Sequence, residues 1–442
     1  MIRRILPLAL ATALCSAPVF AEDLMQTYEL ARSGDPVLSS AESQRIIDRE
    51  GAVQARAGLL PQLSGTVDFG RGYTAGSSER DSNRTYGARL SQSVFNWGTI
   101  NQYRAAREFD AAGNYDLDAA NDDLIVRTAD AYFRVLEATE TLAAAEAAEE
   151  AFQKQFDYAD KRLEVGLAPI TDVHEARAQY DSARANAILA RNALRDAFEA
   201  LAEITGQPVY AFKGLPEDFS PELPAGGDAN AWVATALERN PTLLASGHAV
   251  RASEHSVQSA RGGHLPSLSF GAGYNNNTGW DNNPATLSGR SEGHSIGLTL
   301  SVPIFAGGAT QSGVREAIAR RDQTQDRNEQ IKRAIVRNTR NAYQSLVAGV
   351  SEIEARRLAL VSAQSAYDAS QVGLEVGTRT VIDVLINQQN LFGARQNYAN
   401  ARYNYLRSRL ALEQAAGTLD ATTVQDINRL LTVDVTAPVQ QQ

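Results

Sequence analysis

Four stretches of the chain alternate apolar residues with small or polar ones, the pattern of β-strands that have one apolar face. In the clearest of them, Ile296, Leu298 and Leu300 alternate with glycine, threonine and serine. Alternation of this kind over about ten residues is typical of strands in outer-membrane proteins. The predicted strands cover about 62–74, 84–96, 267–275 and 295–305, with exposed polar loops at 74–83 and 275–294.

Each pair of strands is followed by a long helical stretch, at about 98–166 and 308–377. Both stretches lack proline and are rich in Ala, Glu, Gln and Arg, which are strong helix formers. At 1.5 Å per residue, each would extend for roughly 100 Å. Leu346, Ile353 and Leu360 recur at heptad spacing, which predicts coiled-coil packing. Further helices are predicted at about 36–58, 171–206, 241–262 and 381–417.

The two halves of the chain match each other at one constant interval through the long helices and at a slightly shorter one upstream of the strands, which indicates a duplicated unit. The linker between the units is rich in proline and glycine and predicts irregular structure. The matching pairs include Ala131 and Ala342, Glu164 and Glu375, Gly166 and Gly377, Asp172 and Asp383, and Gly206 and Gly417. The predicted organisation is a first repeat at 22–206, a linker at 207–230, a second repeat at 231–417 and a tail at 418–442.

Residues 1–21 have the features of a secretory signal peptide, with Arg3 and Arg4 before an apolar stretch and Ala21 at the expected cleavage site. The single cysteine, Cys15, lies within this segment, so we expect no disulfide and no zinc-thiolate site in the mature chain. The formal net charge of −10 argues against nucleic acid as a partner.

The remaining sequence has no apolar run near the roughly 20 residues that a membrane helix needs. If the protein enters a bilayer, it must therefore do so as strands of a closed barrel. Four strands per chain are too few, since single-chain outer-membrane barrels begin at about eight. We therefore expect assembly, and strand number alone leaves two or three copies open.

Several specific runs of residues occur along the chain, among them Leu59–Leu63, Ala176–Asp181, Gly263–Pro266, Val376–Thr380 and Asn400–Leu406. These runs resemble the TolC family of outer-membrane efflux and type I secretion channel-tunnels. The similarity extends from Glu22 to about Leu430. It implies an α+β membrane protein in which a homotrimer forms a twelve-stranded outer-membrane β-barrel, continued by a long periplasmic coiled-coil barrel of α-helices.

The resemblance also implies the function, which is the exit duct of tripartite efflux or type I protein secretion systems. In such a duct, partner proteins open an iris-like gate on the periplasmic side. The implied partners are a periplasmic adaptor protein, an inner-membrane RND or ABC transporter, and the lipid of the outer membrane.

By the same resemblance, Asp383 faces the pore at the periplasmic constriction, and Arg379 ties neighbouring helices through Thr171 and Asp172. From the residues alone, the two aspartates are expected to stabilise the starts of their helices. Two positions depart from the family pattern. Ile386 stands where the family has a second acidic ring, and Leu374 replaces its gate tyrosine. These replacements predict a weaker cation trap, a more apolar collar and a gate that opens with less work.

Glycine at 166 and 377 is expected to end each long helix with a left-handed cap, a conformation that costs glycine little. The resemblance places the docking surface for the adaptor at these turns. The residues concerned are Gly166, Leu167, Gly377 and Thr378.

An enzyme is the first alternative, but the 5 histidines are scattered without the spacing of metal ligands. No nucleophile elbow or phosphate-binding loop occurs either, so we expect neither catalysis nor a cofactor. The second alternative is a non-channel periplasmic coiled-coil spacer or adhesin anchored in the outer membrane. It explains the helices but neither the alternating strands nor the duplication.

Overall fold

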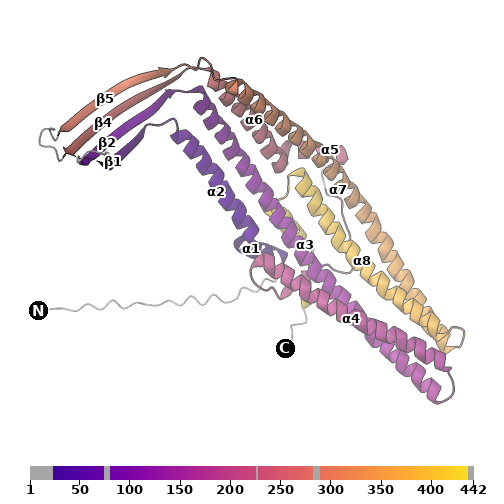
Figure 1. Cartoon of the computed structure of the whole chain (residues 1–442). Coiled ribbons are helices and arrows are strands. Elements are labelled where there is room, and N and C mark those ends of the chain that lie inside the picture. Colours follow the sequence, from indigo (N-terminus) through magenta and orange to yellow (C-terminus); the bar gives the residue numbers. More distant parts are fainter. Residues whose placement is uncertain (1–22, 74–79, 225–226, 282–288, 437–442) are drawn as a thin grey trace, which may run out of the picture.

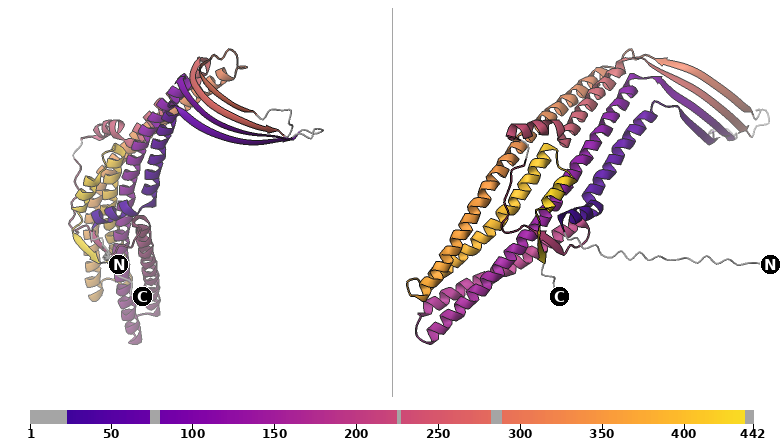
Figure 2. Two further views of the ribbon diagram at one scale, coloured as in Figure 1. Left: turned by 90° about the vertical axis from the view of Figure 1, so that its left-hand side faces the viewer. Right: turned by 180° about the vertical axis from the view of Figure 1, so that it is seen from behind.

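The computed structural model describes residues 23–73, 80–224, 227–281 and 289–436, so the predicted signal peptide lies outside the described residues. A β-sheet forms one end of the molecule, and long helices extend from it to two helical hairpins at the opposite end (Figure 1). The views in Figure 2 show the same elongated shape from the side and from behind.

The sheet contains four antiparallel strands in the order β1-β2-β4-β5, so β2 and β4 join the two halves of the chain. The strands extend further from the helices than predicted, because residues 80–83, 275–281 and 290–294 belong to strands and not to loops. Backbone pairing does not require apolar side chains, so these polar residues continue the ladder. The last strand ends before Pro303, which has no N–H to donate. The strands are β1 (Gln62–Tyr73), β2 (Arg80–Phe95), β4 (Ser267–Asp281) and β5 (Arg290–Ser301).

Four helices run next to one another below the sheet: α2 (Pro36–Ala57), α3 (Trp97–Glu164), α6 (Pro241–Arg261) and α7 (Ala309–Glu375). A 3-10 turn, η1 (Gly262–His264), follows α6. The two shorter helices begin in the same way, because Asp35 accepts from the Leu38 N–H and Asn240 from the Leu243 N–H. Each has proline in its first turn, where the missing N–H costs nothing. None of the helices in the described part of the chain is both long and apolar enough to cross a bilayer.

The far halves of α3 and α7 form antiparallel hairpins with α4 (Ile170–Thr205) and α8 (Val381–Ala416). The heptad positions Leu346 and Ile353 are buried, which confirms the coiled-coil spacing. In the first hairpin, the alanines Ala176 and Ala187 are fully buried. Small side chains at these positions let the helices approach closely.

Residues 207–224 and 419–436, together called the waist, surround the middle of the helical body. The sequence predicts irregular structure for the linker, but β3 (Ala211–Gly214) pairs with β6 (Val433–Thr436). A short helix, α9 (Ala421–Asn428), precedes β6. The remaining helices are α1 (Leu24–Gly34) and α5 (Ala229–Arg239), neither of which the sequence pattern predicted.

Side chains from α3 and α8 hold the waist in place. The Tyr132 hydroxyl donates to the Lys213 carbonyl at 3.0 Å and accepts from its N–H at 2.7 Å. Arg402 donates to the Pro216 carbonyl and Tyr398 to the Glu217 carbonyl. Side chains of α3 and α8 thus bond to backbone groups of the linker. These hydrogen bonds do not depend on which side chains the linker carries.

Candidate functional site

The register of the sheet gathers its apolar side chains on one face. Leu63, Leu90, Ala272 and Ile296 lie opposite one another in a single row across all four strands. The two outer members of this row, Leu63 and Ile296, are 76% and 78% exposed. Large apolar side chains that stand this far out of a sheet need lipid or another protein against them.

The other face of the sheet carries small and polar side chains. The neighbouring row contains Ser64, Arg89, Gly273 and Ser295. In the described chain, β1 and β5 each pair on one side only, so both edges of the sheet present unpaired backbone groups. The described sheet therefore has one apolar face, one small and polar face and two open edges.

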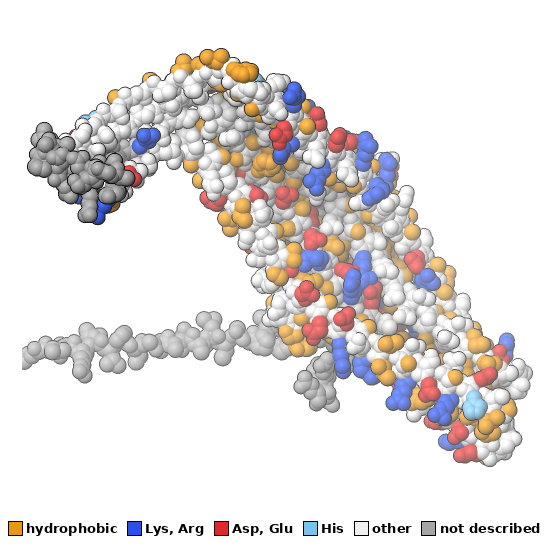
Figure 3. Space-filling view, in the orientation of Figure 1, with side chains coloured by type: hydrophobic (Ala, Val, Ile, Leu, Met, Phe, Trp, Pro, Cys, Tyr) orange, Lys and Arg blue, Asp and Glu red, His pale blue; other side chains and the backbone are white. Residues whose placement is uncertain are grey.

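The apolar surface continues where β5 leads toward α7. Figure 3 shows hydrophobic side chains gathered where the sheet meets the helices. The exposed apolar residues of this segment are Val302, Ile304 and Phe305, of which Ile304 is 95% exposed. The apolar face thus extends to the end of the sheet that meets the helical body.

At the opposite end of the molecule, both hairpins turn by the same backbone geometry. Gly166 and Gly377 have φ angles of +74° and +78°, which confirms the predicted left-handed caps. The N–H of Leu167 donates to the Arg162 carbonyl and that of Thr378 to the Gly373 carbonyl, each at 2.8 Å. Each turn therefore satisfies carbonyl groups that the end of a helix would otherwise leave unpaired.

The start of α8 is closed by a reciprocal capping box. The Asp383 carboxylate accepts from the N–H of Thr380 at 2.9 Å and from its hydroxyl at 2.8 Å, while the Asp383 N–H donates back to Thr380 Oγ1 at 3.3 Å. The hydrogen bond from the Thr380 backbone, followed by that from its hydroxyl, lowers the pKa of Asp383. Sequence reasoning missed Thr380, although threonine three residues before an acidic residue is the signal of this motif.

The start of α4 has no such box. Its N-cap residue is Pro169, which provides no side-chain hydrogen bond, and Asp172 lies in the first turn. Among the described residues, no hydrogen bond involves the Asp172 carboxylate. This aspartate therefore acts on its helix only through its charge near the positive end of the helix dipole.

Arg379 extends across the last turn of α7. A β-carbon at Gly373 would lie 2.6 Å from Arg379 Cγ, so glycine leaves the space that this side chain occupies. Within the described chain, neither a hydrogen bond nor an ion pair joins Arg379 to Thr171 or Asp172. The structure thus gathers Arg379 and Asp383 at one tip and leaves Thr171 and Asp172 at the other.

The two residues that depart from the family pattern lie at the second tip. Leu374 is half-buried in the last turn of α7, and Ile386 is 53% exposed in α8. Leu167 lies at the first tip and Val376 at the second, and each is 68% exposed. Both turns therefore present an apolar side chain to their surroundings.

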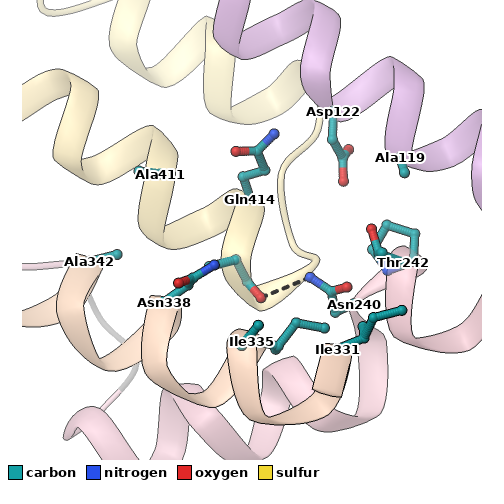
Figure 4. Close-up of a pocket in the computed structure, with 13 residues that line it drawn as sticks. Ala119, Asp122, Asn240, Thr242, Ile331, Ile335, Asn338, Ala342, Ala411 and Gln414 are labelled. Carbon is teal, nitrogen blue, oxygen red and sulfur yellow. Dashed lines mark hydrogen bonds between the residues drawn. The ribbon is translucent and has the colours of Figure 1, made fainter. Parts of the chain in front are cut away.

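A cavity of about 490 Å³ lies between α3, α6, α7 and α8, in the helical body and away from the tips (Figure 4). On one side of this cavity, the side-chain amide of Asn240 donates to the Ala415 carbonyl at 3.1 Å. Asp122 lines the cavity, and burial, together with the nearby Asp118 and Asp420 carboxylates, raises its pKa to about 7. Over the described ranges, no three His, Cys, Asp or Glu side chains are grouped so that they could hold a metal ion.

Comparison with known proteins relates this architecture to export channels. The model of the family described as outer membrane efflux protein matches residues 27–207 and 232–418. The outer membrane protein TolC of Vibrio cholerae is 33% identical over 98% of this chain and 99% of its own length. The alkaline protease secretion protein AprF of Pseudomonas aeruginosa is 27% identical over 92% of this chain and 86% of its own length. The crystal structure of the Campylobacter jejuni CmeC outer membrane channel superimposes with a TM-score of 0.80 at 21% identity, covering 92% of this chain and 89% of that one.

Proposed function

This chain belongs to the outer membrane efflux protein family and is an outer-membrane export channel, and on this basis we propose that three copies assemble into one continuous duct. In this assembly the strands of the three copies close a twelve-stranded barrel in the outer membrane. The helices continue the barrel as a tunnel into the periplasm. Transport is the function of the family, and the channel is favoured over a spacer or adhesin.

The observation that carries the proposal is the two-faced sheet with open edges. Its apolar face suits lipid, and its small and polar face suits a water-filled lumen. Open strand edges cannot remain in a bilayer, because their backbone groups would have no partners there. Pairing β5 of one copy with β1 of the next removes every edge when the ring closes.

The gate lies at the second tip in this proposal. Three copies of Asp383 surround the axis and attract cations, while Ile386 contributes an apolar collar one turn further along α8. Arg379 extends from the same tip and ties it to Thr171 and Asp172 of an adjacent hairpin. With Leu374 in place of a hydrogen-bonding side chain, these ties are few, and the gate opens with little work.

The turns at the ends of the hairpins are the proposed docking surface for a periplasmic adaptor. Gly166, Leu167, Gly377 and Thr378 lie at these turns, where exposed apolar side chains are available to a partner. An inner-membrane transporter of the RND or ABC type supplies the cargo through this adaptor. The name of the relative AprF refers to protease secretion, which supports protein as one class of cargo.

The test is single-channel conductance of the purified full-length mature protein in a planar bilayer, with ion selectivity. We expect small, stable, cation-preferring openings. The Asp383→Asn substitution should lower the cation preference by roughly twofold, because it removes a ring of charge from the narrowest point. Asp172→Asn is the matched control at the other tip and should change the preference less.

A folded assembly, verified by its size in detergent, that conducts no current would contradict the duct. Equal effects of the two substitutions would contradict the position of the gate and leave the duct intact.

A further inference from the structure

At the end of the sheet furthest from the helices, polar and charged side chains replace the apolar ones on the apolar face. On β5, the residues of this face after Ile296 are His294, Glu292 and Arg290. On β2 the apolar series ends at Arg84, and on β1 it ends at Arg71, directly after Phe69. Three arginines thus terminate the apolar face on three different strands.

These arginines lie in two neighbouring rows. Arg84 is paired with Phe69 on one side and Thr278 on the other, and Thr278 is paired with Arg290, so one row contains two of the cations. Arg71 lies in the next row, opposite Ser82. Cations separated by the width of one or two strands repel one another, and an anion between them removes this cost.

Two of the three arginines contact neighbouring side chains. The Arg84 guanidinium stacks over the Tyr86 ring, 4.8 Å from its centre. Arg290 forms an ion pair with Glu292, which also accepts from Asn276 Nδ2 at 2.9 Å. Among the described residues of the last rows, this face carries one carboxylate, Glu292, and three arginines. The opposite face of β2 carries one further arginine, Arg89.

The position of the rim relative to the membrane follows from the length of the apolar series. On β5 and its continuation, this series runs from Ile304 to Ile296. At about 3.3 Å per residue along the strand and a strand tilt of about 35–45°, these positions cover roughly 20 Å of height. Arg290 lies about 15 Å higher, outside an apolar band that is about 25 Å tall in outer-membrane barrels. If the sheet spans the outer membrane as proposed above, the arginines lie at the level of the outer-leaflet head groups.

We propose that Arg71, Arg84 and Arg290 form a binding site for the phosphate groups of a phosphorylated glycolipid in the outer leaflet. Guanidinium groups bind phosphate through paired hydrogen bonds, and a lipid can satisfy the apolar face and the cationic rim with one molecule. Tyr86 and Tyr274 lie in the rows between the rim and the apolar band, where aromatic rings suit the interface. A lipid is favoured over a protein partner because the cationic rim is continuous with the lipid-facing surface.

The experiment compares lipids retained by the purified full-length protein. Detergent-solubilised protein is incubated with bisphosphorylated lipid A or with the same lipid after removal of both phosphates, and bound lipid is counted by native mass spectrometry. The variants are Arg84→Gln with Arg290→Gln, and separately Arg71→Gln. Arg89→Gln is the matched control, since it removes the same charge from the same strand but from the opposite face.

We expect the wild-type protein to prefer the phosphorylated lipid and the double variant to bind it about tenfold more weakly for each arginine removed. Arg71→Gln should weaken binding less than the double variant, and the control should bind as the wild type does. Equal binding of the two lipids by the wild type overturns the proposal. So does an equal loss in Arg89→Gln, or retention of a protein at the rim in place of lipid.

Planar-bilayer conductance of the same samples separates this inference from the proposed function. A variant that conducts normally but loses the phosphorylated lipid supports the site. A wild-type protein that retains the lipid without conducting contradicts the duct and leaves the lipid site in place.

Discussion

The tips of the two hairpins share a backbone turn and differ in the side chains around it. Both turn at a glycine with positive φ, at Gly166 and at Gly377. The first tip begins its return helix with Pro169, which forms no side-chain cap, whereas the second uses the reciprocal pair Thr380 and Asp383. The two hairpins therefore share the turn and differ in what holds the start of the following helix.

The arginines of the two tips also have different surroundings. At the first tip, Arg162 donates to the Leu167 carbonyl at 3.2 Å and lies 5.6 Å from the centre of the Tyr158 ring. At the second tip, the matching position is Gly373, and the arginine is Arg379 on the other side of the turn. At the first tip, the arginine side chain stabilises its own turn by a hydrogen bond. At the second tip, Gly373 leaves the space that the Arg379 side chain occupies.

The largest effect is expected for Gly373→Val. The new side chain would overlap Arg379, whose Cγ lies 2.6 Å from the position of the added β-carbon. We expect the free energy of local unfolding at this tip to fall by about 1–3 kcal/mol, the usual cost of overpacking. Hydrogen exchange of the peptides that cover residues 366–383 measures it.

The matched control is Arg162→Val at the first tip, where the side chain is not enclosed. Its cost should stay below about 1 kcal/mol, since it loses one exposed hydrogen bond and one long contact with the Tyr158 ring. Similar decreases in the free energy of local unfolding in both variants would show that the stability of the second tip does not depend on the space at Gly373.

A smaller effect is expected for Thr380→Ala. It removes the hydroxyl that caps α8 and should lower the stability of the first turn by about 1 kcal/mol. Pro169→Ala, at the matching position of α4, removes no cap and should cost less than about 0.5 kcal/mol. Hydrogen exchange in the first turns of α8 and α4 compares them, and equal exchange rates in the two variants would contradict the difference between the tips.

The smallest effect is the pH dependence of the α8 cap. The pKa of Asp383 is lower in the folded chain than its ordinary value of 3.8, so the carboxylate stabilises the folded form at pH above this value. This contribution is lost as the pH falls below 3.8 through the lowered pKa. Protection of the first turn of α8, corrected for intrinsic exchange rates, should stay constant from pH 7 to pH 5 and decrease only in stronger acid. A decrease already between pH 7 and pH 5 would indicate that neighbouring carboxylates raise the pKa of Asp383 in the assembly.

Long, periodic features of the sequence predicted the elements that matter most for the shape. The heptad positions Leu346 and Ile353 are buried, and the four alternating stretches form the sheet. Periodicity identified these elements because each repeats one pattern over many residues. The same pattern failed at the outer ends of the strands, where Asn276 and Asn277 continue the ladder although neither side chain is apolar.

Features that depend on distant contacts could not be predicted. β3 and β6 have only 4 residues each, too few for a periodic signal, and each forms only because the other is present. The raised pKa of Asp122 depends on burial and on Asp420, which is close to Asp122 in space but far from it in the sequence. The role of Asp383 in the capping box could have been found from the local sequence, whereas its proposed role at the pore depends on other copies of the chain.

The pairing of β3 with β6 has a consequence for biogenesis. Asn428 accepts from the Leu24 N–H at 3.0 Å and donates to Asp23, so the same region also fastens the beginning of the described chain to its end. A polypeptide secreted N-terminus first therefore completes its waist only after the residues following Gly417 have crossed the inner membrane. Pairing between such distant residues is slow compared with helix formation, because a long loop must close first. During this delay the strands stay unpaired, and unpaired strand edges are prone to aggregation.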